Sequence, residues 1–253
     1  MRKNQIREIW ATGRAAVNGW LSVPSPYVAE IMSHQGWDGL TIDLQHGPVD
    51  VPEAIRMMQA MAAGNAVPIV RVPWNEPSAI MRVLDAGAYG IICPMINTPE
   101  DAERFVGACR YPPDGYRSNG AYRGVIYGGA DYLDHANEEI LTFAMIETRE
   151  GVANLAEIAR TPGLNAIYIG PTDLAFSHGY PPKHDNFDGP VADLIAQIRE
   201  TAHAAGIRAG IHATRTDYSA QMISDGFDLV TPTSDVRMLT GAAPNVLSAL
   251  KAE

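Results

Sequence analysis

Five polar residues stand where short apolar segments of the chain end, and their types could support catalysis: Asp43, His46, Arg71, Glu147 and Asp173. Two neighbouring carboxylates repel each other unless a cation lies between them, and an all-oxygen ligand pair suits a hard divalent ion such as Mg²⁺ or Mn²⁺. An arginine fork binds a carboxylate through two hydrogen bonds. Histidine is a suitable general base near neutral pH. The set therefore predicts metal-assisted chemistry on a small carboxylate substrate.

Each of these residues also has an ordinary structural interpretation. Asp43 could cap a turn and His46 could lie in a loop, while Arg71 could form an internal salt bridge. Asp173 could begin a helix as its N-cap, and Glu147 could be paired with a cation. The functional interpretation depends on whether the fold brings all five residues to one place.

The elements that must position these residues are short apolar segments that alternate with helical patterns. The segments are rich in Val, Ile and Leu without strict alternation, which is typical of parallel strands buried on both faces. The expected strands are Ala15–Leu21, Gly39–Leu44, Val67–Val72, Gly90–Ile96, Leu141–Glu147, Ala166–Gly170, Arg208–Ala213 and Leu229–Thr233.

Between these strands lie helical patterns, several of which begin near Pro and end just before Gly. The expected helices are Pro26–Gln35, Pro52–Ala62, Pro77–Ala86, Pro99–Cys109, Arg149–Ala159, Val191–Ala205, Thr214–Ser224 and Val236–Lys251. Eight strand–helix units in 253 residues predict a single-domain (β/α)8 TIM barrel over residues 1–253. An open doubly wound sheet is the rival fold, but no glycine-rich nucleotide-binding turn follows the first expected strand.

One long connection interrupts the alternation of strands and helices. It covers residues 110–140 and contains five glycines. Long connections in compact domains are usually functional. We expect this insertion to help select the substrate, with Arg117, Tyr122 and Arg123 as candidate contacts.

The composition excludes several classes of partner. The net charge of −10 argues against a nucleic acid or an anionic membrane surface as partner, because both need a basic face. No segment has the length and apolar character of a membrane span, and the expected location is the cytoplasm. The two cysteines, Cys93 and Cys109, lack zinc-ligand spacing and are expected to be reduced thiols.

Several motifs, in order along nearly the whole chain, resemble the HpcH/HpaI aldolase family, the class II pyruvate aldolases typified by 4-hydroxy-2-oxoheptanedioate aldolase. They are Asn18-Gly19-Trp20-Leu21, Ile42-Asp43-Leu44-Gln45-His46, Val70-Arg71-Val72, the segment 84–92 (LDAGAYGII), Pro94-Met95, Arg110-Tyr111-Pro112-Pro113, Met145-Ile146-Glu147-Thr148-Arg149-Glu150 and the segment 168–174 (YIGPTDL).

This resemblance implies roles for individual residues. Glu147 and Asp173 would bind a divalent metal ion, Mg²⁺, Mn²⁺ or Co²⁺. His46, paired with Asp85, would be the base, and Arg71 would contact pyruvate. The pocket would be formed by Trp20, Arg71, Pro94, Gly170, Thr172 and Arg123. The resemblance also implies a homo-hexamer, a dimer of trimers or a trimer of dimers, in which C-terminal helices are exchanged.

One position departs from the family pattern. Many members have Glu where this chain has Gln45, directly before His46. A neutral amide removes a charge that could raise the pKa of the histidine, so the resemblance does not settle the pH optimum of this chain.

The function expected from these residues is reversible aldol cleavage of a 4-hydroxy-2-oxo acid into pyruvate, or a related 2-oxo acid, and an aldehyde, through a metal enolate. A citryl-CoA-type lyase and an oxaloacetate-type decarboxylase are alternatives on the same scaffold, and an inactive barrel that serves as a binding protein is another. A lysine imine is the other way to activate a donor carbonyl. The chain has only Lys3, Lys183 and Lys251, and none lies on an expected strand.

Overall fold

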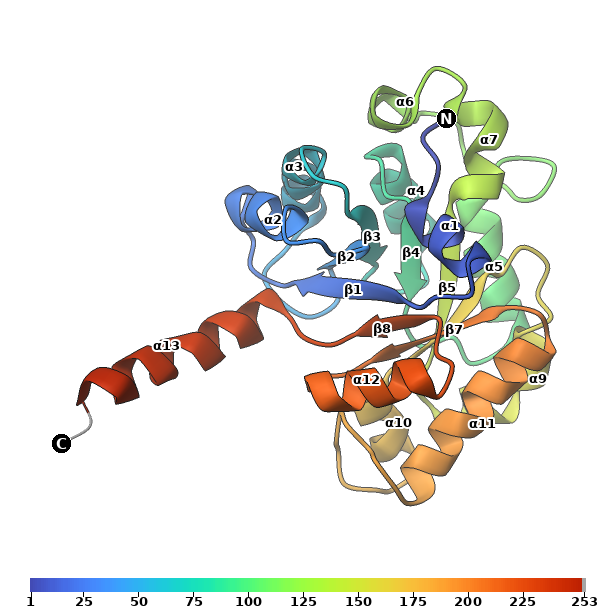
Figure 1. Ribbon diagram of the computed structural model, residues 1–253. Helices are drawn as coiled ribbons and strands as arrows, with labels where there is room; N and C mark the ends of the chain where they lie inside the picture. Colours follow the sequence, from blue (N-terminus) through green and yellow to red (C-terminus); the bar gives the residue numbers. More distant parts are fainter. Residues whose placement is uncertain (252–253) are drawn as a thin grey trace.

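The computed structural model confirms the predicted (β/α)8 barrel. It describes residues 1–251, so the last two residues of the expected domain lie outside the described residues. Eight parallel strands close in sequence order, and the first strand pairs with the last through Ala16–Leu229 and Val17–Val230 (Figure 1). The strands are β1 Ala16–Leu21, β2 Gly39–Asp43, β3 Val67–Arg71, β4 Gly90–Cys93, β5 Leu141–Ile146, β6 Ala166–Ile169, β7 Arg208–His212 and β8 Leu229–Thr231.

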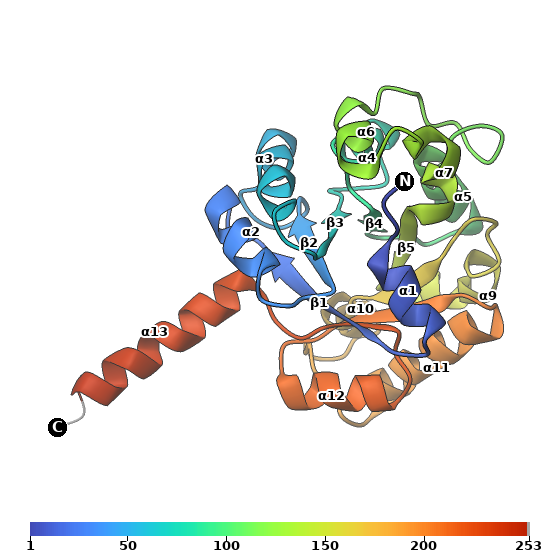
Figure 2. The same ribbon diagram turned by 45° about the horizontal axis from the view of Figure 1, so that its top comes forward.

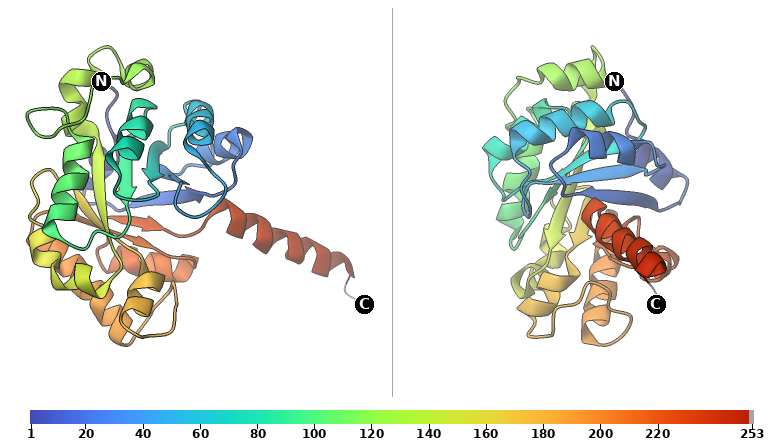
Figure 3. Two further views of the ribbon diagram at one scale, coloured as in Figure 1. Left: turned by 180° about the vertical axis from the view of Figure 1, so that it is seen from behind. Right: turned by 90° about the vertical axis from the view of Figure 1, so that its left-hand side faces the viewer.

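Helices surround this barrel and cover its outer face (Figures 1 and 3). They are α1 Gln5–Ala11, α2 Pro26–Ser33, α3 Val51–Met61, α4 Pro77–Asp85, α5 Pro99–Cys109, α6 Tyr122–Gly128, α7 Tyr132–Glu139, α8 Arg149–Ala153, α9 Leu155–Ile158, α10 Pro171–Ser177, α11 Pro190–Ala204, α12 Thr216–Ser224 and α13 Asp235–Lys251.

Local sequence explains why many of these helices begin where they do. Ser25, Asp50 and Thr98 each accept a hydrogen bond from a backbone amide of the following first turn, and a proline follows each cap within two residues. Such caps satisfy amide groups that have no partner inside the helix. The sequence did not predict α1, α6, α7 and α10, and the helix expected at Arg149–Ala159 is divided into α8 and α9.

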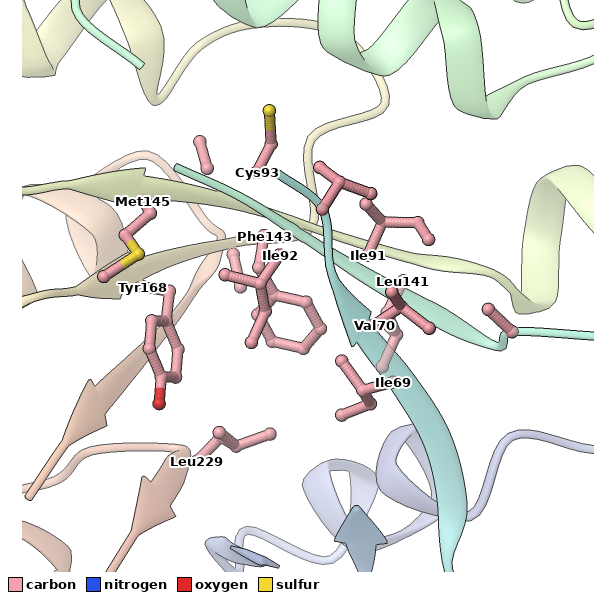
Figure 4. Close-up of a cluster of buried hydrophobic side chains, with 14 of the residues drawn as sticks. Ile69, Val70, Ile91, Ile92, Cys93, Leu141, Phe143, Met145, Tyr168 and Leu229 are labelled. Carbon is pink, nitrogen blue, oxygen red and sulfur yellow. The ribbon is translucent and has the colours of Figure 1, made fainter. Parts of the chain in front are cut away.

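The core lies inside the barrel and between the barrel and its helices. Ile69, Ile92, Phe143 and Leu229, from four different strands, are fully buried and gather in one cluster (Figure 4). Burial on both faces explains why the strand segments carry almost continuous apolar sequence.

The N-terminal end of the barrel is closed by α1 and the insertion. The Asn4 side chain donates hydrogen bonds to the carbonyls of Tyr89, next to the start of β4, and of Glu139, at the end of α7. Lys3 pairs with the Glu139 carboxylate at 2.7 Å. The N-terminus therefore lies beside α6 and α7 (Figure 2). This end of the barrel is sealed by packing and hydrogen bonds, and the opposite end remains for the functional site.

The last helix, α13, projects away from the barrel (Figures 1 and 2, and the left view of Figure 3). It carries several exposed apolar side chains, among them Leu239, Val246, Leu247 and Leu250. No helix in the described part of the chain is both long enough and apolar enough to cross a membrane.

A buried carboxylate fixes the point where α13 leaves the barrel. Asp235 is 2% exposed and accepts hydrogen bonds from the amides of Ser22 and Val23, which follow β1. Ser22 and Ser234 both line the cavity described below. The Asp235 side chain therefore ties the loop after β1 to the start of α13 at the edge of the functional site.

We predict that Asp235→Ala lowers the free energy of unfolding by about 2–3 kcal/mol, because it leaves two amides without their acceptor. Urea denaturation followed by circular dichroism measures this loss. Asp225→Ala is the matched control, because Asp225 is exposed at the end of α12 and its replacement should change stability by less than about 0.5 kcal/mol. Equal stability of the two variants would show that the Asp235 tether is unimportant.

Candidate functional site

A cavity of about 290 Å³ opens at the C-terminal ends of the strands. In barrel enzymes this end carries the active site. The residues that line it are Trp20, Ser22, Asp43, His46, Arg71, Met145, Gly170, Pro171, Thr172, Asp173, His184, His212 and Ser234. The structure thus gathers seven of the residues singled out from the sequence: Trp20, Asp43, His46, Arg71, Gly170, Thr172 and Asp173.

Asp43 organises one wall of this cavity. It is 2% exposed, and its two carboxylate oxygens accept hydrogen bonds from Arg71 Nε at 2.8 Å and Arg71 Nη2 at 2.5 Å. Trp20 Nε1 donates to Asp43 Oδ2 at 3.3 Å, and the Arg71 guanidinium lies 4.8 Å from the centre of the Trp20 ring. This two-point pairing holds Arg71 in one orientation.

The same carboxylate shapes the loop that carries His46. The backbone amides of Gln45 and His46 both donate to Asp43 Oδ1. The His46 side chain is exposed and lines the cavity. Gln45 has a side-chain oxygen that is buried without a hydrogen-bond partner among residues 1–251. The loop after β2 therefore presents the imidazole to the cavity on a backbone fixed by Asp43.

Glu147 follows β5 and is 3% exposed. Its Oε1 accepts a hydrogen bond of 2.9 Å from the amide of Met95, a residue with φ of 55°. The pKa of Glu147 is raised to about 7, because burial and the nearby Asp173 raise it more than the Met95 amide and Arg71 lower it. Glu147 does not line the cavity itself.

Gly170 leaves room for the Glu147 side chain next to the cavity wall. A Cβ at position 170 would lie 2.6 Å from Glu147 Oε2 and 2.5 Å from Met145 Cε, so a larger residue there would force the ends of these two side chains to move. Gly170 and Asp173 both line the cavity, and Asp173 lies in the first turn of α10.

The two carboxylates fit a divalent cation. Glu147 Oε2 accepts no hydrogen bond from any described residue, and burial beside Asp173 disfavours its charged form. A cation between the carboxylates would relieve this cost. No group of three or more His, Cys, Asp or Glu residues in the described part of the chain could hold a metal. Two protein ligands would leave the remaining coordination positions to water and substrate.

Asp85 is not brought to His46 within one chain. It lies at the C-terminal end of α4, five residues before β4 begins, so it is at the opposite end of the barrel. Its carboxylate pairs with the fully buried Arg117 guanidinium at 2.8 Å. The expected pairing of His46 with Asp85 is therefore absent from a single copy of the molecule.

Arg123 and Pro94 are also absent from the cavity wall. Arg123 donates hydrogen bonds to the carbonyls of Ala86 and Met58, near the ends of α4 and α3. The insertion that carries it lies between α5 and β5. In a barrel, a segment between a helix and the next strand lies at the N-terminal end of the strands, so neither Arg123, Arg117 nor Tyr122 reaches the cavity of its own chain. Pro94 is buried just before Met95 and does not line the cavity.

Sequence reasoning missed two histidines. His212 ends β7, and His184 lies in the loop before α11 with its Nδ1 at 3.0 Å from Thr172 Oγ1. The two rings are 5.9 Å apart. His212 stands at the end of an apolar strand, which is the signal that identified Asp43. His184 has no comparable signal, because it lies in a polar loop.

The lysines do not line the cavity. Lys3 pairs with Glu139 at the other end of the barrel, and Lys183 is exposed in the loop that carries His184. Lys251 is the last described residue, at the end of α13. The geometry of the described residues therefore offers no amine for an imine with a substrate bound in this cavity.

Comparison with known proteins shows which family this chain resembles. The family model HpcH/HpaI aldolase/citrate lyase matches residues 17–242. A hydroxypyruvate/pyruvate aldolase of Rhizorhabdus wittichii is 42% identical over 98% of this chain and 99% of its own length. A 4-hydroxy-2-oxo-heptane-1,7-dioate aldolase of Klebsiella pneumoniae is 36% identical over 81% of this chain and 79% of its own.

A solved structure extends the likeness to the whole fold. A HpcH/HpaI aldolase/citrate lyase family protein from Burkholderia cenocepacia superposes with a TM-score of 0.91 at 33% identity, and the match covers 98% of this chain and 100% of that chain. The match of the family model and the similarity of near-full-length relatives agree with the strand-end cavity described above. The chain belongs to the HpcH/HpaI aldolase/citrate lyase family.

Proposed function

We propose that this protein is a metal-dependent, class II aldolase that cleaves 4-hydroxy-2-oxo acids to pyruvate, or a related 2-oxo acid, and an aldehyde, and that also catalyses the reverse addition. The observation that carries the proposal is the meeting of Glu147, Asp173, Arg71 and His46 at one end of the barrel. The names of the Rhizorhabdus and Klebsiella relatives support a carbon–carbon lyase acting on such acids.

Glu147 and Asp173 would hold a divalent ion, Mg²⁺, Mn²⁺ or Co²⁺. When bound, the ion supplies a Lewis acid that stabilises negative charge developing on the keto oxygen of the donor. The Met95 amide holds Glu147 in place through a hydrogen bond, and the absence of a side chain at Gly170 leaves room for the Glu147 carboxylate. Asp173 is exposed at the start of α10, so it can meet the ion from the cavity side.

Arg71 would bind the donor through the part of its fork that Asp43 leaves free. Nε and one hydrogen of Nη2 are engaged by Asp43, so the two Nη1 hydrogens and the second Nη2 hydrogen are left for the substrate. Arg71 is 8% exposed, and hydrogen bonds from a charged donor are strong in such a buried position. Arg71 thus orients a carboxylate or enolate oxygen without having to move.

His46 would act as the base that removes a proton from the carbon next to the donor carbonyl. Its imidazole faces the cavity, while its backbone is anchored to Asp43. In the direction of addition, the resulting enolate carbon attacks the aldehyde, and the aldehyde oxygen takes up a proton. In cleavage the same steps run backwards, so one histidine that gains and loses a proton can serve both directions.

The alternatives fit the cavity less well. A citryl-CoA-type lyase would need cations for the phosphates of CoA, and among the described residues that line the cavity Arg71 is the single arginine or lysine. Decarboxylation of an oxaloacetate-type acid shares the enolate and is compatible as a side reaction. An inactive scaffold would have no need of the buried Asp43–Arg71 pair beside an exposed histidine.

We further propose that the protein assembles as a homo-hexamer through its C-terminal helices. The exposed apolar residues of α13 have no partner surface in a single copy, and burying them against a second copy would be favourable. A hexamer can be built as a dimer of trimers or as a trimer of dimers. In such an assembly a pair between His46 and Asp85 would have to join two copies, because one chain places them at opposite ends of its barrel.

We predict that removal of divalent ions with a chelator abolishes aldol cleavage and that Mg²⁺, Mn²⁺ or Co²⁺ restores it. Glu147→Gln and Asp173→Asn should each weaken Mn²⁺ binding, measured by calorimetry, by more than about 100-fold, since even a residue that only supports a ligand can be worth that much. Glu150→Gln is the control, because Glu150 is an exposed residue of α8 three positions after Glu147. Normal cleavage by metal-free protein would contradict the proposal.

We predict that Arg71→Lys lowers kcat/KM for cleavage by at least about tenfold and as much as roughly 10²–10³-fold, because lysine keeps the charge but cannot bond to Asp43 and the donor in the same plane. Steady-state kinetics with a 4-hydroxy-2-oxo acid measures the loss. Arg56→Lys, at an exposed arginine on α3, should behave as wild type. An Arg71→Lys variant with unchanged kinetics would show that Arg71 has only a structural role.

A further inference from the structure

A chain of polar groups crosses the interior of the barrel and ends at His212. Asn18 Nδ2 donates to Thr231 Oγ1 at 2.9 Å, Thr231 Oγ1 lies 2.8 Å from Tyr168 Oη, and Tyr168 Oη lies 3.2 Å from His212 Nδ1. Asn18, Thr231 and Tyr168 are fully buried. Buried polar groups of this kind must satisfy one another, because water does not reach them.

The proton on each group of this chain can be assigned by counting donors. The Asn18 amide gives its two hydrogens to Thr41 and Thr231, so the Thr231 oxygen is an acceptor on that side. The hydroxyl hydrogen of Thr231 then needs an acceptor, and Tyr168 Oη is the one in reach among the described residues. Tyr168 has a single hydrogen, which is left for His212 Nδ1.

This assignment fixes the tautomer of His212. Its Nδ1 accepts a hydrogen bond from Tyr168, so the ring hydrogen is on Nε2. The pKa of His212 is lowered to about 3, mainly by burial and also by the nearby Arg71, so the ring is neutral at any pH at which the barrel would work. Nε2 has no partner among residues 1–251, and the ring lines the cavity.

The surroundings of His212 hold the ring in place. The Trp20 ring meets it edge to face, with 4.8 Å between ring centres and 85° between planes. The ring therefore offers the cavity one neutral N–H donor in a fixed direction. The groups that would bind the 2-oxo acid part of a substrate are Glu147, Asp173 and Arg71, so His212 is left for a different part of the substrate.

We propose that His212 Nε2 donates a hydrogen bond to a hydroxyl group carried by the substrate next to its reacting carbon, and that the enzyme thereby prefers hydroxylated substrates. This inference rests on the aldolase function proposed above. A single neutral donor beside a tryptophan suits a neutral oxygen better than a carboxylate, which would call for a cation. The hydroxyl can belong to a 3-hydroxy-2-oxo acid donor or to a 2-hydroxyaldehyde acceptor.

The test uses four substrate pairs, pyruvate or hydroxypyruvate with propanal or glycolaldehyde, in the presence of Mg²⁺. For wild type, His212→Leu and His212→Gln, kcat/KM is measured for each pair and expressed relative to pyruvate with propanal. We expect His212→Leu to lower the preference for a hydroxylated substrate by about tenfold, the value of one hydrogen bond. His212→Gln retains an N–H group and should keep part of the preference.

The pair in which the preference falls identifies the source of the hydroxyl. A fall with hydroxypyruvate assigns the hydroxyl to the donor, and a fall with glycolaldehyde assigns it to the acceptor. Tyr168→Phe tests Tyr168 as a positioning residue, because it removes the hydroxyl that fixes the His212 tautomer and keeps the ring. It should lower the same preference by a smaller factor. His135→Leu, on the exposed face of α7, is the matched control.

Several results would overturn the inference. If His212→Leu keeps the wild-type preference for hydroxylated substrates, the proposed hydrogen bond is excluded. If the leucine variant does not fold, a wild-type preference in both His212→Gln and Tyr168→Phe excludes it. An equal loss with all four pairs would mean that His212 is structural, and a lost preference in His184→Leu alone would assign the hydroxyl to the other histidine. Failure of wild type with pyruvate and propanal would instead contradict the aldolase function.

Discussion

All eight strands of the barrel run in the same direction, and this constraint decides where each functional group lies. Closure between β1 and β8 leaves no free sheet edge, and because neighbouring strands pair in parallel, all of them end at the same rim. Loops that follow strands meet at that rim, and loops that follow helices meet at the other end. Asp43, Arg71, Glu147 and Asp173 are up to 130 residues apart in the chain, yet they come together because each stands at or just beyond the end of a strand.

Two buried carboxylates at this rim show how the environment separates structural from reactive roles. Asp43 is fully engaged by the Arg71 fork, the Trp20 indole and two backbone amides, so its charge is compensated inside the protein. Glu147 has one amide partner and a second carboxylate nearby, and burial raises its pKa to about 7. The first carboxylate fixes the positions of its neighbours, whereas the second is left in need of a cation. This contrast is what supports Glu147 as a metal ligand.

Much of the fold was predictable from the sequence, because strands buried on both faces carry continuous apolar segments. All eight expected strands are present, and so is α13 within one residue of its expected start. Helix α1 was not predicted, because it is a seven-residue helix whose role is to seal the end of the barrel through Asn4 and Ile6. Such a role depends on tertiary contacts that a local pattern does not contain.

Most of the candidate site was also predictable from the sequence. The residues that were misplaced share one physical cause. Residues at strand ends were placed well, but Asp85 and Arg123 belong to segments that precede strands and so lie at the far end of the barrel. The order of elements already implied this, since the insertion follows the helix Pro99–Cys109. His212 was overlooked although it ends a strand. Its significance lies in a hydrogen-bond chain through β1, β6 and β8 that only the folded barrel assembles.

The central claim is that this rim of the barrel turns a 2-oxo acid into an enolate with the help of a divalent ion and His46. Exchange of the methyl protons of pyruvate for deuterium, followed by NMR in D₂O without any aldehyde, tests it directly. The account predicts rapid exchange with Mg²⁺ or Mn²⁺, no exchange after chelation, and exchange slowed by about 10²–10⁴-fold in His46→Ala. Exchange at the full rate in metal-free protein, or an unchanged rate in His46→Ala, would contradict it.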